Sequence, residues 1–214
     1  MKNPRIKFKV IFLKNGYDFE EIKNKIEELI NWCSIFEDLS LTKPEKEDGK
    51  YSSGNLSFRA SNDSFIITAS CLKSKRDLNK DDFVLVKSCD LRNKIVYACG
   101  SKNPSSESML HYAIYKNRKD VNAIFHAHFP SKDFEERIRK LALANKNKTK
   151  EIKIAFTKKE EKFGTISLVN SVLEILNKKN FIIMKNHGFL SLEKDMKEAG
   201  EIVLKLLKNL SYVK

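Results

Sequence analysis

The stretch Val121-Asn-Ala-Ile-Phe-His-Ala-His, residues 121–128, predicts a buried strand that ends in two histidines. Side chains two residues apart on a strand point to the same face, so His126 and His128 can reach one common ion. Alone, such a pair is a weak signal, because two polar residues on one strand face are usually only surface. His187 strengthens it, since this histidine ends another strand-like apolar run and precedes a glycine that suits a backbone turn. Two strand ends in one sheet can bring these three imidazoles together, which is the ligand set of an open catalytic zinc site.

The sequence around this stretch predicts helices that alternate with short strands. Apolar runs predict strands at residues 6–13, 55–60, 64–68, 83–88, 95–99, 121–128, 152–156 and 181–184. Helical spacing predicts helices at residues 18–36 (with Asp18 as N-cap), 105–116, 133–144, 166–176 and 192–210. Short polar turns suit hairpins after the second and fourth strands. This order predicts a single α/β or α+β domain around a largely antiparallel sheet.

Length and composition describe one globular domain. A chain of 214 residues with 41% hydrophobic and 32% charged residues can bury one substantial core, and nothing in it demands two domains. Its apolar runs are too short to cross a bilayer, and residues 1–9 lack the apolar core of a signal peptide. The four cysteines show no C-x-x-C spacing. We therefore expect a cytoplasmic protein with reduced thiols and no membrane partner.

The formal charge of +13 raises the question of nucleic acid. The excess is nearly all lysine, and it is spread along the chain among glutamate and aspartate. No basic arm and no arginine–aromatic alternation typical of RNA binding is present. We interpret the charge as a solvated surface that also attracts anionic substrates, and nucleic-acid binding is the less favoured reading.

Two further motifs could bind an anion. Ser105, Ser106 and Glu107 stand at a predicted helix start, where hydroxyls and free backbone N–H groups can bind a phosphate. Residues 51–57, Tyr-Ser-Ser-Gly-Asn-Leu-Ser, form a turn of small residues whose N–H groups can also face a phosphate. Taken singly, the first motif is explained by helix capping and the second is an ordinary turn.

Taken together and in order, these motifs resemble the class II aldolase/adducin domain family. The motifs are Ser53-Gly54-Asn55-Leu56-Ser57, Ile67-Thr68-Ala69-Ser70, Ser105-Ser106-Glu107, His126-x-His128 and Asn186-His187-Gly188. The resemblance covers residues 52–210, and residues 1–50 add an N-terminal strand, a helix and a charged connector to the single domain expected over 1–214. It implies a three-layer α/β/α fold with a central, mainly antiparallel sheet. It also implies a homotetramer whose active sites lie between subunits.

The resemblance also implies roles for individual residues. In the aldolase branch His126, His128 and His187 would hold one divalent ion per chain, most simply zinc. Glu107 would be a further metal ligand in the resting site and the proton-transferring base during catalysis. The ion would stabilise the enediolate that forms when a carbon–carbon bond of a small sugar phosphate breaks. The substrate phosphate would be bound by Gly54, Asn55, Ser70, Ser105 and Ser106.

His111 and Cys71 lie close to the motifs but are not part of them. His111 follows Glu107 by one helical turn, so it faces the same side, and we expect it to support the site or pack in the core rather than bind the metal. Cys71 stands where the family's phosphate-binding loop usually has glycine, so either the loop shifts or the substrate differs. Fuculose-phosphate-type aldolases also use a tyrosine that has no counterpart here, since none occurs between Tyr115 and Tyr212.

The sequence therefore allows more than one reaction at this metal site. A glutamate at position 107 favours an aldolase-like lyase, because pentulose-phosphate epimerases of the family have aspartate there. An epimerase or dehydratase that uses the same metal site is the alternative, and a non-catalytic adducin-like module is another. The donor set also suits manganese, cobalt or iron.

Overall fold

A nine-stranded mixed sheet forms the centre of the computed structural model, which describes residues 5–14, 22–44, 50–62, 64–131, 133–144 and 152–210. The strand order is β1-β5-β4-β3-β2-β6-β9-β8-β7. The outermost pairs β1·β5 and β7·β8 are parallel and the pairs between them are antiparallel, so the sheet is mainly antiparallel, as predicted. The strands are β1 (Lys9–Phe12), β2 (Asn55–Arg59), β3 (Phe65–Thr68), β4 (Phe83–Asp90), β5 (Ile95–Cys99), β6 (Ala123–Ala127), β7 (Ile154–Phe156), β8 (Phe181–Met184) and β9 (Gly188–Glu193).

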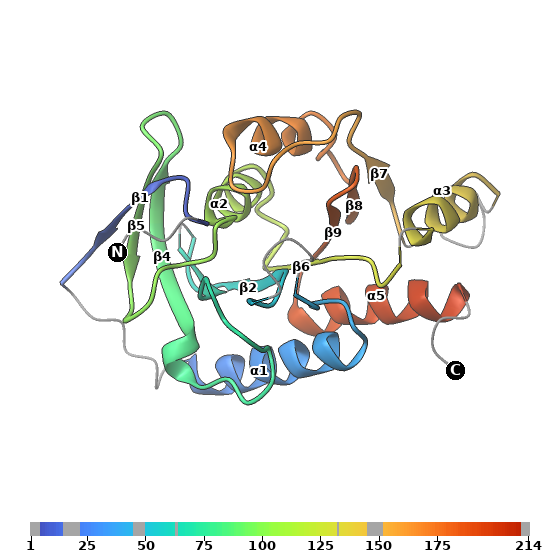
Figure 1. Ribbon diagram of the computed structural model, residues 1–214. Coiled ribbons are helices and arrows are strands. Elements are labelled where there is room, and N and C mark those ends of the chain that lie inside the picture. Colours follow the sequence, from blue (N-terminus) through green and yellow to red (C-terminus); the bar gives the residue numbers. More distant parts are fainter. Residues whose placement is uncertain are drawn as a thin grey trace.

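Helices cover both faces of the sheet and give the three layers that the family resemblance implies (Figure 1). One buried cluster joins α1 and α5 to one face, and a second cluster joins α2 and α4 to the other. The helix α3 packs against the first cluster through Phe134 and Ile138. None of the described helices is both long and apolar enough to span a membrane. The helices are α1 (Lys23–Asp38), α2 (Ser108–Asn117), α3 (Phe134–Ala144), α4 (Ile166–Leu173) and α5 (Met196–Asn209), with a short 3-10 turn η2 (Lys80–Asp82).

The prediction of a helix from Leu192 to Leu210 was wrong at its start. Residues 188–193 form the strand β9, and α5 begins at Met196 behind Asp195, whose carboxylate accepts a 2.8 Å hydrogen bond from the N–H of Glu198. The strand is buried between two helical layers, so it lacks the apolar–polar alternation that identifies a half-exposed strand.

Smaller differences concern helix ends. The helix α2 begins at Ser108 instead of Ser105, and α4 ends at Leu173 instead of Leu176. The proposed N-cap Asp18, the polar break at 145–149 and most of the charged connector at 43–50 lie outside the described residues.

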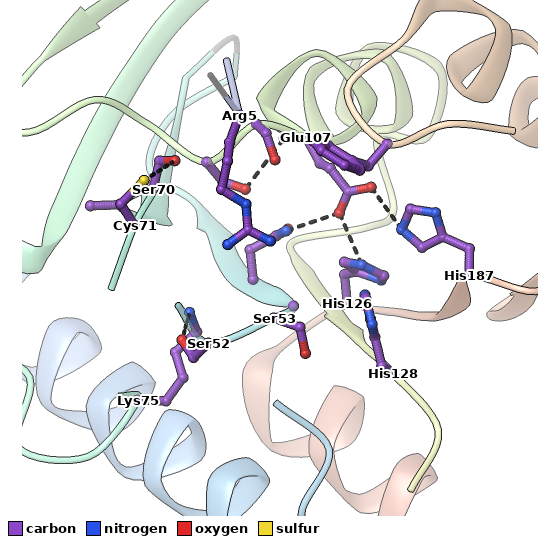
Figure 2. Close-up of a pocket in the computed structure, with 16 residues that line it drawn as sticks. Arg5, Ser52, Ser53, Ser70, Cys71, Lys75, Glu107, His126, His128 and His187 are labelled. Atoms are coloured by element: carbon purple, nitrogen blue, oxygen red, sulfur yellow. Dashed lines mark hydrogen bonds and ion pairs between the residues drawn. The ribbon is translucent and has the colours of Figure 1, made fainter. Parts of the chain in front are cut away.

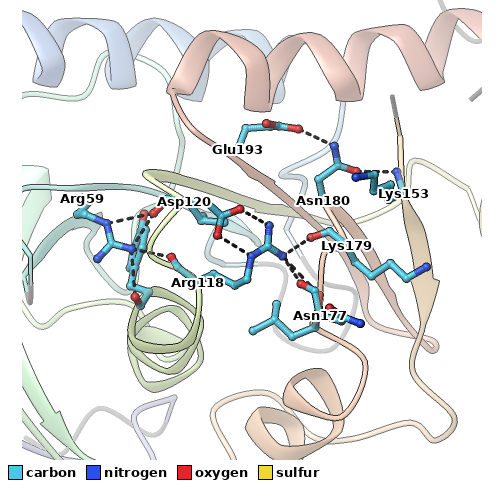
Figure 3. A network of polar contacts seen from close by, with 11 residues as sticks. Arg59, Arg118, Asp120, Lys153, Asn177, Lys179, Asn180 and Glu193 are labelled. Atoms are coloured by element: carbon cyan, nitrogen blue, oxygen red, sulfur yellow. Dashed lines mark hydrogen bonds and ion pairs between the residues drawn. The ribbon is translucent and has the colours of Figure 1, made fainter. Parts of the chain in front are cut away.

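Arg118, which follows α2, belongs to a network of polar contacts near the start of β6 (Figure 3). Its guanidinium forms two hydrogen bonds with the Asp120 carboxylate, of 2.8 and 2.7 Å. It also donates to the carbonyls of Leu176, Asn177 and Lys179, in the turn between α4 and β8. These contacts tie the end of α2 to the turn that leads into β8.

Arg59, at the end of β2, makes the neighbouring connections. It donates to the carbonyls of Tyr115 (3.1 Å), Arg118 (2.9 Å) and Val121 (2.7 Å). One side chain therefore satisfies carbonyls at the end of α2 and just before β6. The two arginines fix the start of β6, whose other end carries His126 and His128.

Replacing Arg118 by methionine is expected to lower the free energy of unfolding by about 2–3 kcal/mol, because carbonyls lose charged hydrogen-bond donors. Asp120 is 68% exposed, so its ion pair contributes little of this effect. Urea titration compares the free energies of unfolding of the wild type and of Arg118→Met. The control is Arg92→Met, which changes an exposed arginine. A loss below about 0.5 kcal/mol for Arg118→Met would show that the network is dispensable.

Candidate metal centre

Three imidazoles meet beside the end of β6. His126 lies in β6, His128 follows this strand directly, and His187 lies in the turn between β8 and β9. One ligand nitrogen from each histidine lies within 4.8 Å of the other two. The ring centroids are 5.1, 5.1 and 5.3 Å apart. The structure therefore brings together the three histidines that the sequence singled out, in a group that can hold a metal ion.

Glycines allow two other chain segments to approach this strand end. A Cβ on Gly188 would lie 2.3 Å from the carbonyl oxygen of Ala127 and 3.1 Å from the His128 ring. A Cβ on Gly54, where φ is +67°, would lie 2.7 Å from the carbonyl oxygen of His126. Real side chains cannot occupy such positions, so glycine is needed at both places to hold the histidines at their observed spacing.

Glu107 faces the histidines from the start of α2 and is 3% exposed (Figure 2). Its Oε2 lies 2.9 Å from Nε2 of His126, and its Oε1 lies 3.1 Å from Nε2 of His187. Asn55 donates a 3.0 Å hydrogen bond to Oε2. Burial alone would raise the pKa of Glu107, but the charges and hydrogen bonds of His126 and His187 outweigh it and hold the pKa well below its usual value. Glu107 is therefore a carboxylate aimed at the ligand nitrogens.

The protonation of the histidines also fits metal binding. Burial, and next the neighbouring imidazoles of His126 and His187, hold the pKa of His128 well below its usual value, so its own imidazole is neutral. Nδ1 of His126 lies 2.9 Å from the carbonyl oxygen of Phe189. A proton on that nitrogen leaves the Nε2 lone pair free to bind an ion. Three imidazole nitrogens and one carboxylate form a donor set that suits zinc and several other divalent ions.

One pocket contains both the histidines and the serine motifs (Figure 2). Ser70 follows β3, and its N–H donates a 2.9 Å hydrogen bond to the carbonyl of Asn103. This bond, with the bridge between Ala69 and Pro104, places Ser70 beside the start of α2. The residues expected to bind phosphate all line this pocket: Gly54, Asn55, Ser70, Ser105 and Ser106.

His111 lies outside the converging group of histidines. It is fully buried, and its Nδ1 lies 2.7 Å from Oγ of Ser57, which in turn lies 2.8 Å from the hydroxyl of Tyr115. Burial lowers the pKa of His111 to about 3, so its ring is neutral. This polar cluster joins α2 to β2, which accords with a supporting role.

Sequence reasoning missed other pocket residues. Arg5 and Lys75 bring positive charge to the pocket, and Phe163 brings an aromatic ring. No motif marked these two cations, because the chain has 41 lysines and arginines and their burial depends on the fold. Among the residues that the structure describes, no tyrosine lines the pocket.

Cys71 retains the backbone conformation that a glycine would take. Its φ is 62°, in the left-handed region, and its sulfur lies 3.6 Å from Oγ of Ser70. A glycine could adopt this conformation without strain, whereas a cysteine adopts it at a cost. The cost of this conformation is about 1–2 kcal/mol, and the side chain contributes a thiol to the pocket wall.

We expect iodoacetamide to alkylate Cys71 at least about 100-fold faster than the other cysteines, and phosphate to slow this reaction. Cys71 is partly exposed, whereas Cys33, Cys89 and Cys99 are buried. Burial also raises the pKa of Cys33 to about 12 and raises that of Cys89, which suppresses the reactive thiolates. Peptide mapping after brief alkylation checks the prediction, and equal labelling with and without phosphate would contradict it.

The sequence is similar to a known protein family and to several named enzymes. The profile of the Class II Aldolase and Adducin N-terminal domain matches residues 40–209. The chain is 30% identical over 172 residues to an L-fuculose phosphate aldolase of Methanococcus maripaludis, covering 78% of this chain and 89% of that relative. A shorter match, 35% over 98 residues, links it to an L-fuculose phosphate aldolase of Methanocaldococcus jannaschii, covering 45% of this chain and 52% of the relative.

Solved structures share the fold. A sugar-phosphate aldolase from Thermotoga maritima superposes with a TM-score of 0.68 at 20% identity, covering 91% of this chain and 98% of the other. An L-fuculose 1-phosphate aldolase superposes with a TM-score of 0.62 at 24% identity, covering 86% and 84%. These likenesses establish the three-layer architecture of the chain.

Proposed function

Because the chain belongs to the class II aldolase and adducin family, we propose that it is a metal-dependent aldolase acting on a small sugar phosphate. It would cleave or form a carbon–carbon bond through an enediolate. The observation that carries this proposal is the pairing of three histidines and Glu107 with serine-rich loops in one pocket. One part of the pocket suits a metal ion, and the other suits an anion.

The metal would be one divalent ion per chain, most simply zinc, held by His126, His128, His187 and, in the resting site, Glu107. Such an ion acts as a Lewis acid that polarises a carbonyl and stabilises the negative charge developing on its oxygen. The burial of His126 and Glu107 strengthens the electrostatic interactions at that point.

Glu107 would carry the proton of the reaction. A carboxylate that binds the ion in the resting site can be released when substrate arrives, and it then accepts or returns a proton next to the reacting carbon. Asn55 holds Oε2 of Glu107 through a 3.0 Å hydrogen bond, which orients the carboxylate for this transfer. Glutamate at this position is also the feature that favours a lyase over an epimerase.

The substrate phosphate would lie against Gly54, Asn55, Ser70, Ser105 and Ser106. Ser105 and Ser106 precede the first turn of α2, where N–H groups and the positive end of the helix dipole favour an anion. Serine hydroxyls add neutral donors that suit phosphate oxygens. The names of a relative and of a solved structure, L-fuculose phosphate aldolase and L-fuculose 1-phosphate aldolase, suggest L-fuculose 1-phosphate as the first substrate to assay.

The deciding experiment combines elemental analysis with an aldol-cleavage screen on one purified sample. We expect about one zinc-like ion per chain and release of an aldehyde from at least one ketose phosphate, lost on chelation and restored by zinc. Metal-loaded protein that leaves a panel of pentulose and hexulose phosphates unchanged would refute the proposal. A product with all carbons retained would instead indicate an epimerase or dehydratase, and a protein that binds no metal would indicate a non-catalytic module.

We further propose that the chain forms the homotetramer that the family resemblance implies, with active sites between subunits. Light scattering would then give about four times the chain mass of 24.8 kDa.

A further inference from the structure

Lys75 is a buried lysine in the wall of the candidate site. It lies between β3 and η2, is 2% exposed and lines the same pocket as the histidines and serines. The carboxylate of Glu37, on α1, accepts hydrogen bonds from the backbone N–H of Lys75 and from the hydroxyl of Ser74. This carboxylate anchors the segment to α1 and fixes the point from which the Lys75 side chain extends.

The ammonium group of Lys75 has few protein partners. Its Nζ donates a 3.0 Å hydrogen bond to Oγ of Ser52, although an ammonium has three N–H donors. Within the described part of the chain, no carboxylate lies within ion-pair distance of Nζ. The carboxylate of Glu37 contacts Arg76, and that of Asp82 pairs with Lys102 at 2.5 Å. Burial lowers the pKa of Lys75 to about 8, which reflects the cost of this poorly partnered charge.

The position of Lys75 suits an anion bound in the pocket. Figure 2 shows its side chain rising toward Ser52, below the loop of Ser70 and Cys71, while the Arg5 guanidinium points into the pocket above it. Cations therefore line the part of the pocket next to the Ser70 loop, and Glu107 and the histidines line the other part. A substrate that places its reacting carbons near Glu107 would bring its phosphate toward the cations.

We infer that Lys75 binds the substrate phosphate directly and makes this site selective for phosphorylated over unphosphorylated sugars. This inference rests on the proposed function, because it takes the pocket as the substrate site. A phosphate would use the remaining donors of the ammonium in charge-assisted hydrogen bonds and would neutralise its buried charge. The backbone and serine donors alone offer neutral hydrogen bonds, which discriminate less strongly between a dianion and a hydroxyl group.

The test measures binding of inorganic phosphate to the zinc-loaded protein by calorimetry, so it needs no turnover. We expect Lys75→Met to weaken phosphate binding about 10- to 100-fold with unchanged zinc content. The control is Lys73→Met, which removes an exposed positive charge from the same segment and should change the affinity less than about 2-fold. A folded Lys75→Met protein that binds phosphate like the wild type would overturn the inference.

Two further measurements keep the result interpretable. Lys75→Gln retains an N–H donor for Ser52 without the charge, so it should fold even where methionine does not, and it should bind phosphate as weakly. In phosphate-soaked crystals of the unaltered protein, a phosphate oxygen should lie about 3 Å from Nζ of Lys75. Phosphate bound only at the zinc ion would refute the inference. Phosphate bound at Lys75 in a protein that cleaves no ketose phosphate would refute the aldolase proposal instead.

Discussion

Replacement of Glu107 by glutamine is expected to lower kcat by about 1,000-fold while the protein keeps its metal. Glutamine has nearly the same shape and can still contact Asn55, but its amide cannot accept and return a proton at neutral pH. The histidines remain to hold the ion, so zinc content should stay near one per chain. Steady-state assays on the substrate identified by the screen, with elemental analysis of the same sample, check both parts.

The matched control for this variant is Glu27→Gln, which changes an exposed glutamate on α1 and should leave kcat within about 2-fold of the wild-type value. If Glu107→Gln retained both its zinc and its full kcat, another group would have to carry the proton. If it lost zinc as well as activity, Glu107 would be required as a metal ligand and its catalytic role would have to be tested by adding excess zinc.

Replacement of His126 by alanine is expected to weaken zinc binding by more than about 100-fold, since even the partners that orient metal ligands contribute 10- to 100-fold. Nε2 of His126 lies 2.9 Å from Glu107, and its Nδ1 contacts the carbonyl of Phe189, so its ring has one well-defined orientation. Competition with a chromophoric chelator measures the affinity. Activity should fall in parallel and recover partly at high zinc concentration.

The control changes the fourth histidine of the chain. His111→Gln can keep a hydrogen bond to Ser57 and removes no nitrogen from the converging group, so its zinc content should match the wild type. The protein would lose some stability, because His111 is fully buried. Equal loss of zinc in His111→Gln and His126→Ala would show that the metal lies elsewhere or that both changes act through unfolding.

The strands were the most predictable part of the fold. The runs at 55–60, 64–68 and 95–99 match β2, β3 and β5 within one residue at each end, because turn residues or glycine bound them clearly. The strand β9 was missed because it is buried on both faces, so its apolar pattern resembles the start of a helix. The end of a helix such as α4 depends on tertiary contacts that local spacing does not encode.

The candidate site was predictable where a residue type is rare or its position fixed by a motif. The chain has four histidines, so the spacing of three of them carried information. Lys75 is one of 41 basic residues, and only folding distinguishes it by burying it beside Ser52. The effect of Cys71 was likewise undecided in the sequence, because its backbone conformation depends on how the loop packs against neighbouring segments.

The central place of β6 has a consequence for when the proposed metal site can form during synthesis. His126 pairs with Asn55 on one side and with Leu190 on the other, so its neighbours come from distant parts of the chain. A ribosome must therefore release the chain beyond Leu190 before the complete ligand set can form. Such distant pairings form slowly, and metal binding contributes to the free energy of folding. We therefore expect the ion of the proposed site to bind only after this region has been synthesised.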